Sequence, residues 1–334
     1  MTVLKDNVLA LLVGAKGSSL SGETMSSSLG VSRAAVWKAV EALRQEGYQI
    51  SSAPHRGYVL EKSPDRLSAG VISASLAGRL VGREIVCLDT VDSTNEEVKR
   101  RAAAGAPTGL AVLAETQTGG KGRRGRSFQS PAGQGLYLSV LLRPHCPPEQ
   151  LFQITAWTAV AVCDGIAAAC GIRPGIKWTN DLVLNGKKLC GILTELGLEG
   201  ESGAVDYVAV GIGINVSQTS EDFIPEVRGV ATSLAQALTP PPARNILAAA
   251  VLAALDDMYA SFPAAREEYL KRYRAGCLTL GRPCRLLRAD GTSDEAFAED
   301  VDDSFSLIVR CPDGNRKTVF TGEVSVRGLF GYAD

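Results

Sequence analysis

The sequence predicts a multidomain α+β protein with three parts, and three observations support this. Three short helical patterns followed by a hairpin occupy residues 1–62. Strands then alternate with helices over residues 66–272. Over residues 276–334 the pattern becomes all-β, with turns at Asp290-Gly291 and Asp313-Gly314, which predicts a small β-barrel. A chain of 334 residues is long enough for two or three domains.

The composition is that of a globular protein and argues against several functional classes. Hydrophobic residues make up 45% of the chain and charged residues 21%, and the net charge is −1. The whole molecule is therefore not a generic binder of polyanions, and any nucleic-acid contact has to come from a local patch. We expect no membrane span and no signal peptide, which favours a cytoplasmic location.

The cysteines and histidines limit the chemistry that the site can use. Eight cysteines are scattered along the chain without a Cys-x-x-Cys pair, so we expect them to be reduced. His55 and His145 are the two histidines, which argues against a zinc site or a histidine-based triad. Catalysis therefore has to rest on carboxylates, lysines, arginines and a metal.

The N-terminal part is predicted to be a winged helix-turn-helix. Apolar residues at helical spacing predict three helices, over residues 4–15, 21–29 and 33–46. Ser32 is a natural N-cap for the third of them. A hairpin follows, with strands over residues 48–52 and 58–60. Helices and a hairpin in this order are typical of DNA-binding winged helices.

The third helix and the hairpin carry the candidate DNA contacts, which are Ser32, Arg33, Lys38 and Arg56. Residues 1–60 contain six Lys/Arg and four Asp/Glu, a balance of +2. This charge is too small for tight binding by one copy, because affinity scales with the phosphates neutralised. We therefore expect a homodimer on a palindromic operator. A helical cap domain without a DNA role is the competing interpretation.

Residues 119–126, Gly-Gly-Lys-Gly-Arg-Arg-Gly-Arg, combine four glycines with four cations. Glycine lets the backbone approach a ligand closely, and the arginine fork matches phosphate and carboxylate oxygens. Flanking strands are predicted over residues 110–115 and 135–142, so this segment is predicted to be a loop around a polyanionic ligand. A dinucleotide-binding fingerprint is rejected because Pro131 and Gly133 break the helix that must follow it. A solvated basic loop, which could bind nucleic acid, is the alternative.

A second polar group lies around a predicted hairpin turn at Asn185-Gly186. Asp181 is suited to holding Mg²⁺, and Asn180 to binding a phosphate or the metal shell. Lys188 is suited to neutralising charge that develops during a reaction. An ordinary turn beside an exposed lysine pair would explain the same residues.

The remaining segments complete an α/β pattern. Further strands are predicted over residues 84–88, 175–178, 182–184, 187–196 and 207–210. Helices are predicted to end near residue 104 and to cover residues 150–170 and 244–262. Residues 211–215, Gly-Ile-Gly-Ile-Asn, follow the last strand, and their glycines would let a flat ligand lie against the backbone.

The order and spacing of these motifs closely resemble the bifunctional biotin–protein ligase and biotin operon repressor family. The matching segments are residues 32–35, 92–95, 119–126, 177–181, 188–191, 211–215 and 322–327. They span nearly the whole chain in the family's order, and the ordered set is highly specific. The resemblance implies a winged helix-turn-helix, a catalytic domain related to class II aminoacyl-tRNA synthetases and an SH3-like barrel.

The resemblance also implies a reaction and its residues. Biotin and ATP would give biotinyl-5′-adenylate and pyrophosphate, and biotin would then pass to one lysine of a biotin carboxyl carrier protein domain. The implied biotin contacts are Ser93, Thr94, Asn95, Gln117, Gly120, Lys121, Gly122, Arg123, Lys188, Gly191 and Gly211. The implied contacts to ATP or the adenylate are Arg123, Arg124, Arg126, Phe128, Asn180, Asn215 and Arg327. The implied catalytic residues are Lys188, Arg123 and Asp181, the last as a proton acceptor or a Mg²⁺ ligand.

Two positions depart from the family pattern. Lys121 replaces the first arginine of the loop, which keeps the charge and loses the planar fork. Thr179 replaces a proline, which frees the backbone before Asn180. We expect residues 116–128 to be mobile without ligand and to fold over biotin or the adenylate, with Phe128 as a lid.

Two other functions fit parts of the pattern. One is a winged-helix transcription factor that senses a nucleotide without catalysis. The other is a lipoate–protein ligase of the same superfamily, whose pocket would take a linear dithiolane acid. Release of pyrophosphate tests the first alternative, and competition with free biotin tests the second.

Overall fold

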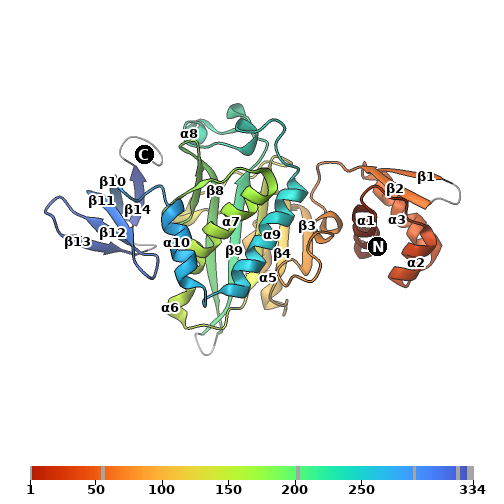
Figure 1. The fold of residues 1–334 in the computed structure, drawn as a ribbon, viewed down its shortest axis with the longest axis horizontal. Coiled ribbons are helices and arrows are strands. Elements are labelled where there is room, and N and C mark those ends of the chain that lie inside the picture. Colours follow the sequence, from red (N-terminus) through yellow and green to blue (C-terminus); the bar gives the residue numbers. More distant parts are fainter. Residues whose placement is uncertain (1, 54–56, 201–203, 289–290, 321–323, 329–334) are drawn as a thin grey trace.

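The computed structural model describes residues 2–53, 57–200, 204–288, 291–320 and 324–328. The winged helix-turn-helix and a C-terminal β-sheet lie at opposite ends of a central domain (Figure 1). Three of the residues singled out in the sequence, His55, Arg56 and Asp290, lie outside the described residues.

The N-terminal domain has the predicted three helices and hairpin. Its elements are α1 (Thr2–Gly14), α2 (Gly22–Leu29), α3 (Arg33–Gln45), β1 (Gln49–Ala53) and β2 (Gly57–Lys62). Val8, Val36 and Leu43 are fully buried at their contact, as the helical spacing predicts. Ser32 caps α3 by accepting a hydrogen bond of 3.2 Å from the Ala35 amide.

The central domain is built on a mixed seven-stranded sheet. Its strands are β3 (Glu84–Val91), β4 (Leu110–Gln117), β5 (Gly135–Leu142), β6 (Gly175–Lys177), β7 (Asp181–Leu184), β8 (Lys187–Leu198) and β9 (Val205–Asn215). They are ordered β3-β4-β5-β9-β8-β7-β6, and only the β3–β4 pair is parallel among the described strands. Residues 211–215, predicted to follow a strand, are instead the end of β9 and pair with β5 and β8.

Helices cover both faces of this sheet. They are α4 (Ala69–Ser73), α5 (Thr94–Ala103), α6 (Pro148–Leu151), α7 (Ile154–Cys170), α8 (Pro225–Arg228), α9 (Arg244–Ser261) and α10 (Arg266–Gly276). Along β4, Leu110 and Val112 pack with Val98 of α5, while Ala111 and Leu113 belong to the core beneath α7 and α9. This alternation puts α5 on one face and the α7–α9 pair on the other (Figure 1).

The segment Pro148–Cys170 differs in two ways from the sequence expectation. It is divided into α6 and α7 rather than forming one helix. It is also long and apolar enough to cross a membrane by length and composition, which the sequence analysis did not expect. However, 78% of its apolar window is buried inside the protein, with Trp157 fully enclosed, so it serves as a core helix here.

The C-terminal part is a small antiparallel sheet. Its strands are β10 (Arg282–Arg288), β11 (Ser293–Val301), β12 (Leu307–Arg310), β13 (Arg316–Val319) and β14 (Val324–Gly328), in the order β13-β12-β11-β10-β14. Within the described residues β13 and β14 are the two edges and do not pair, so the structure shows an open sheet and not a closed barrel. The Trp178 indole donates to the Phe305 carbonyl (2.9 Å) and so attaches this sheet to the central domain.

A buried arginine anchors the segment that joins the winged helix to the central domain. The Arg244 side chain is 1% exposed and pairs with Asp65 (3.3 Å) and Glu115 (2.7 Å). The neighbouring Asn245 accepts from the Ser68 amide (2.9 Å) and donates to the backbone carbonyl of residue 66 (2.7 Å). We call Asp65, Glu115 and Arg244 the linker anchor, because they bind the linker to β4 and α9.

Candidate ligand-binding and catalytic site

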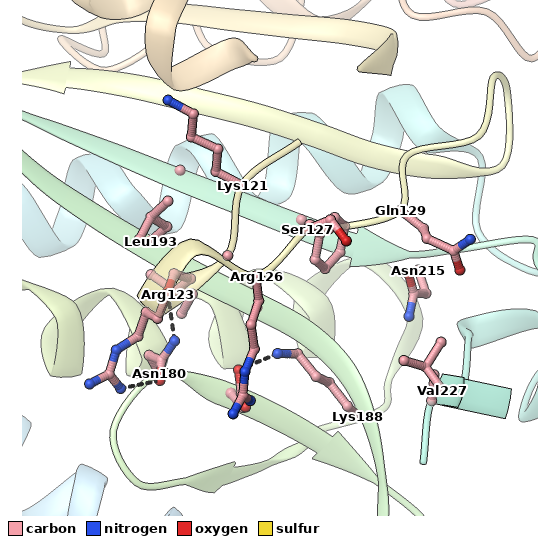
Figure 2. A pocket seen from close by; sticks show the side chains of 18 of the residues that line it. Lys121, Arg123, Arg126, Ser127, Gln129, Asn180, Lys188, Leu193, Asn215 and Val227 are labelled. Carbon is pink, nitrogen blue, oxygen red and sulfur yellow. Dashed lines mark hydrogen bonds and ion pairs between the residues drawn. The ribbon is translucent and has the colours of Figure 1, made fainter. Parts of the chain in front are cut away.

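A cavity of about 650 Å³ opens on the face of the central sheet, beneath residues 119–126 (Figure 2). The start of α5, the end of β4, the β6–β7 turn, β8, β9 and the segment around α8 contribute to its walls. All of the ligand-binding and catalytic residues named from the sequence line it, except Gly120 and Arg327. Gly120 belongs to the loop, at a position where a Cβ atom would collide with the Phe128 carbonyl. The backbone of Arg327 pairs with β10, and its side chain lies outside the described residues.

One end of the cavity is a buried polar cluster, which we call the head pocket. The Gln117 side-chain oxygen accepts from the amide and hydroxyl of Thr94 (2.9 and 3.2 Å). The Gln117 amide nitrogen donates to the Ser130 hydroxyl (2.8 Å). Ser139 lies 2.7 Å from the Thr94 hydroxyl and 2.6 Å from the Asn95 side-chain oxygen. These bonds hold donors and acceptors in fixed directions, and Thr94, Asn95, Ser130 and Ser139 are buried.

Glycines on β8 and β9 form a flat floor beside the head pocket. Gly191 pairs with Gly213 across the two strands. A Cβ atom on Gly213 would lie 2.6 Å from the Phe128 ring, and one on Gly211 would collide with the Asn95 side chain. The floor is therefore bare backbone because larger residues would fill the space between the sheet and the loop.

The loop over residues 119–126 covers this floor. The Gly122 amide donates to the Arg126 carbonyl (2.7 Å), and the Phe128 amide donates to the Gly120 carbonyl (2.8 Å). The Arg123 guanidinium reaches across to the Asn180 side-chain oxygen (2.8 Å; Figure 2). Burial lowers the pKa of the Arg123 guanidinium below its ordinary value, and the charge of Asp181 opposes this effect.

Cations meet a carboxylate at the opposite end from the head pocket. The Lys188 ammonium lies 2.7 Å from the Asp181 carboxylate, on adjacent strands β8 and β7. Figure 2 shows the Arg126 side chain directed toward the same region. This end therefore concentrates positive charge, whereas the head pocket at the other end is neutral and polar. Such an arrangement suits an anionic ligand whose other end is uncharged and polar.

Comparisons with known proteins place the chain in a family. Models match it over residues 5–59 (HTH domain), 87–215 (Biotin/lipoate A/B protein ligase family) and 279–327 (Biotin protein ligase C terminal domain). The bifunctional ligase/repressor BirA of Bacillus spizizenii is 42% identical over 236 residues, which cover 71% of this chain and 72% of that protein. The chain belongs to the bifunctional biotin–protein ligase and repressor family.

Two further matches extend over more of the molecule. The bifunctional ligase/repressor BirA of Escherichia coli is 31% identical over 335 residues, which cover 97% of this chain and 99% of that protein. The structure of the biotin protein ligase from Aquifex aeolicus, solved in complex with biotin and ATP, has a TM-score of 0.63 and 27% identity. This match covers 74% of this chain and 99% of the Aquifex aeolicus chain. The chain is thus a biotin–protein ligase with an HTH domain.

Two loop cations of this ligase have partners outside the cavity. The Lys121 ammonium pairs with Glu96 of α5 (2.6 Å), and Figure 2 shows the side chain directed away from Arg126. The Arg124 guanidinium lies 3.4 Å from the Leu287 carbonyl of β10, and so links the loop to the C-terminal sheet. Residue type and order alone did not reveal either pairing, because both partners are distant in the sequence.

Ser139, behind the cavity wall, and one group of lining residues were missed in the sequence. Ser139, which bonds to Thr94 in the head pocket, is the one serine in the largely apolar strand β5, and that contrast was an available signal. Phe223, Ile224, Val227 and Val230 form an apolar wall near Lys188. The Lys188 amide donates to the Val230 carbonyl (2.7 Å), which ties this wall to β8. Its helix, α8, has only four residues, too few for a periodic pattern.

The winged helix presents a mixed basic and apolar face. Arg33 and Lys38 are exposed on α3, as expected, and Trp37 between them is 54% exposed. Arg44, at the end of α3, instead donates to the Ile50 carbonyl (2.9 and 2.7 Å) and holds the helix against β1. Ser32 is both exposed and the N-cap of α3. No pattern in the sequence singled out Trp37.

Proposed function

We propose that this ligase joins biotin to ATP, giving biotinyl-5′-adenylate and pyrophosphate, and then transfers biotin to one lysine of a biotin carboxyl carrier protein domain. The observation that carries this proposal is that one cavity has two unlike ends. The head pocket supplies fixed neutral donors and acceptors, which suit the ureido ring. The other end carries Lys188 and Arg126, which suit a carboxylate meeting a triphosphate.

The arrangement suits binding of both substrates side by side. Thr94, Asn95 and Gln117 would hydrogen-bond the ureido group, and the glycine floor would lie under the flat ring system. The apolar wall around Val227 offers a dry surface for the adenine. Asn180 and Asn215 would contact ATP or the adenylate, with Phe128 closing over the floor between them.

The first step needs positioning more than acid–base chemistry. The biotin carboxylate is already ionised at neutral pH. One of its oxygens forms a bond to the α-phosphorus while the bond from that phosphorus to the bridging oxygen breaks, and pyrophosphate leaves with the electron pair. Lys188 and Arg126 offset the repulsion between the anions, and Lys188 would hydrogen-bond the reacting carboxyl oxygen.

Asp181 fits two roles in the reaction. Mg²⁺ in nucleotide sites is commonly held by one or two carboxylates together with substrate phosphates, so one protein carboxylate beside the phosphate region suffices. Bound Mg²⁺ would neutralise phosphate charge there. In the second step the carrier lysine attacks the acyl carbon and AMP leaves. Asp181 would then accept the proton of the amine, with Lys188 2.7 Å away to hold its carboxylate.

Mass spectrometry of a carrier domain after incubation with the protein, ATP, Mg²⁺ and biotin tests the ligase proposal. We expect one lysine to gain the mass of biotin and pyrophosphate to be released. Transfer of lipoate without competition from free biotin would favour the lipoate–protein ligase. Absence of pyrophosphate release with intact nucleotide binding would favour a nucleotide sensor.

A second role, as a repressor, is favoured by the exposed face of α3. Arg33 and Lys38 would contact phosphates and base edges, and Trp37 would contact apolar groups in the major groove. We propose that two adenylate-loaded copies bind operator DNA of biotin genes as a homodimer. Mobility-shift titration with and without biotin and ATP tests this. Binding that does not depend on the ligands would contradict the coupling.

Two structural and cellular expectations complete the proposal. The C-terminal strand order, with β14 beside β10, is compatible with an SH3-like curl in which β13 and β14 approach each other. Cross-strand amide contacts by NMR would test that closure. We also propose a cytoplasmic location, which cell fractionation tests.

A further inference from the structure

A chain of alternating charges runs along the outside of the cavity. The Lys121 ammonium lies 2.6 Å from Glu96, and Glu96 lies 3.1 Å from Lys99. Lys99 in turn lies 2.6 Å from Glu195. The chain ends inside the site, because the Asn95 amide nitrogen donates to the Glu195 carboxylate (2.7 Å). Four side chains therefore connect the head pocket to the loop that covers it.

Three members of this charge chain belong to a helix or a strand. Glu96 and Lys99 lie one turn apart in α5, whose buried side is fixed by Val98 against β4. Glu195 comes from β8, an interior strand of the sheet. Lys121 is the member that belongs to a loop. A link between a rigid helix and a loop limits the movement of the loop.

The electrostatics agree with a specific contact. The hydrogen bond from Lys121 is the largest influence that holds the pKa of Glu96 below its usual value, and Lys99 acts in the same direction. The Lys121 side chain is 52% exposed, so the pair is accessible to salt and to solvent. On the opposite side of the loop, Arg123 bonds to Asn180 (2.8 Å). The loop is thus held by Glu96 outside the cavity and by Asn180 inside it, in addition to the contact between Arg124 and β10.

We propose that Glu96 is a positioning residue that latches the loop over the cavity through Lys121, while Lys99 and Glu195 connect this latch to Asn95 in the head pocket. The inference rests on the proposed function for its ligand, because the latch retains biotin and the adenylate. It also explains the lysine at position 121. A flexible stem with a compact charge reaches a carboxylate on the helix without needing the planar fork of arginine.

The chain offers a matched control in the adjacent residue. Glu97 pairs with Arg100 (2.9 Å) and Arg101 (2.7 Å) within α5, so Glu97→Gln removes the same charge from the same helix turn. Trypsin cleavage after Arg123 and Arg124 is measured on the full-length protein without ligand. We expect Glu96→Gln to be cleaved about two- to fivefold faster than the parent, as loss of an exposed pair predicts, and Glu97→Gln to match the parent.

Ligand release gives a readout that a general loss of stability would not mimic. For Glu96→Gln we expect biotin and the adenylate to dissociate faster by a similar factor, with little change in their association rates. The effects of Glu96→Gln and Lys121→Gln on the cleavage rate should not add in the double variant, because both substitutions remove the same contact. Lys121→Arg should restore slow cleavage relative to Lys121→Gln, and high salt should narrow the difference between Glu96→Gln and the parent.

Equal cleavage rates for Glu96→Gln and Glu97→Gln would overturn the latch, and so would additive effects in the double variant. The cleavage assay needs neither biotin nor ATP. If the carrier domain stays unmodified while Glu96→Gln is cleaved faster, the latch stands and the proposed reaction fails. If biotin transfer occurs and the two variants are cleaved alike, the reaction stands and the latch fails.

Discussion

Arg244 and the arginines of the loop that follows β4 differ in what neutralises their charge. In the linker anchor, Arg244 is 1% exposed and two carboxylates of the same chain surround it. In the loop that follows β4, Arg123 and Arg126 line the cavity and turn toward the space for a ligand (Figure 2). The residue type is the same in both groups. Arg244 is structural because fixed carboxylates enclose it, whereas Arg123 and Arg126 border the space for a ligand.

Arg244→Ala tests the structural side of this comparison and should have the largest effect. Glu115, whose side chain is 14% exposed, would lose its ion pair and stay partly buried. Breaking a buried pair in this way costs about 3–5 kcal/mol. The free energy of unfolding is measured by urea titration. Arg100→Ala, at an ion-paired arginine that is 51% exposed, is the control, and an equal loss in both variants would refute the distinction.

Lys188→Ala tests the ligand-facing side. Removing a donor that stabilises developing charge costs about 3–4 kcal/mol in the transition state, so pyrophosphate release should fall several-hundredfold. Biotin affinity should change far less, because Lys188 lies at the end of the cavity away from the head pocket. Lys187→Ala is the control, because Lys187 precedes Lys188 in the sequence and its side chain is exposed. Normal pyrophosphate release by Lys188→Ala would exclude a catalytic role.

Arg123→Gly should loosen the loop and let the adenylate escape. Its hydrogen bond to Asn180 (2.8 Å) is the inner tie of the loop, and a bond to a charged group contributes about 1.5–3 kcal/mol. We expect at least tenfold more biotin on the lysines of a bystander protein. Labelling is measured by mass spectrometry with serum albumin present. Modification confined to the carrier lysine, at a normal yield of adenylate, would contradict this shielding role.

Lys38→Ala on the winged helix should have the smallest effect. One phosphate contact fewer should reduce the slope of log affinity against log salt by about 1, nearly independently of DNA sequence. Arg33→Ala, at the start of α3, should also relax sequence preference. Fluorescence anisotropy at several salt concentrations measures both, with ligase activity as the folding control. An unchanged salt slope would show that Lys38 makes no phosphate contact.

Local patterns were sufficient for most of the elements. β5 lies at the predicted residues 135–142 because its eight residues are mostly apolar and lie between turn signals. The end of β9 was missed because Gly211 and Gly213 resemble a break in a strand, whereas pairing with two neighbours keeps them extended. α10 was missed because its charged sequence conceals the buried side formed by Tyr269, Leu270 and Tyr273.

The sequence by itself determined the family, the order of the three parts and most of the residues that line the cavity. Those conclusions depend on residue types at short spacings, which a linear pattern contains. Only the tertiary structure decided which cations serve the fold and which border the ligand space. Arg244 meets Glu115 across 129 residues, and Lys121 meets Glu96 across 25. The role of a charge depends on its partners and its burial, and folding brings both from distant parts of the chain.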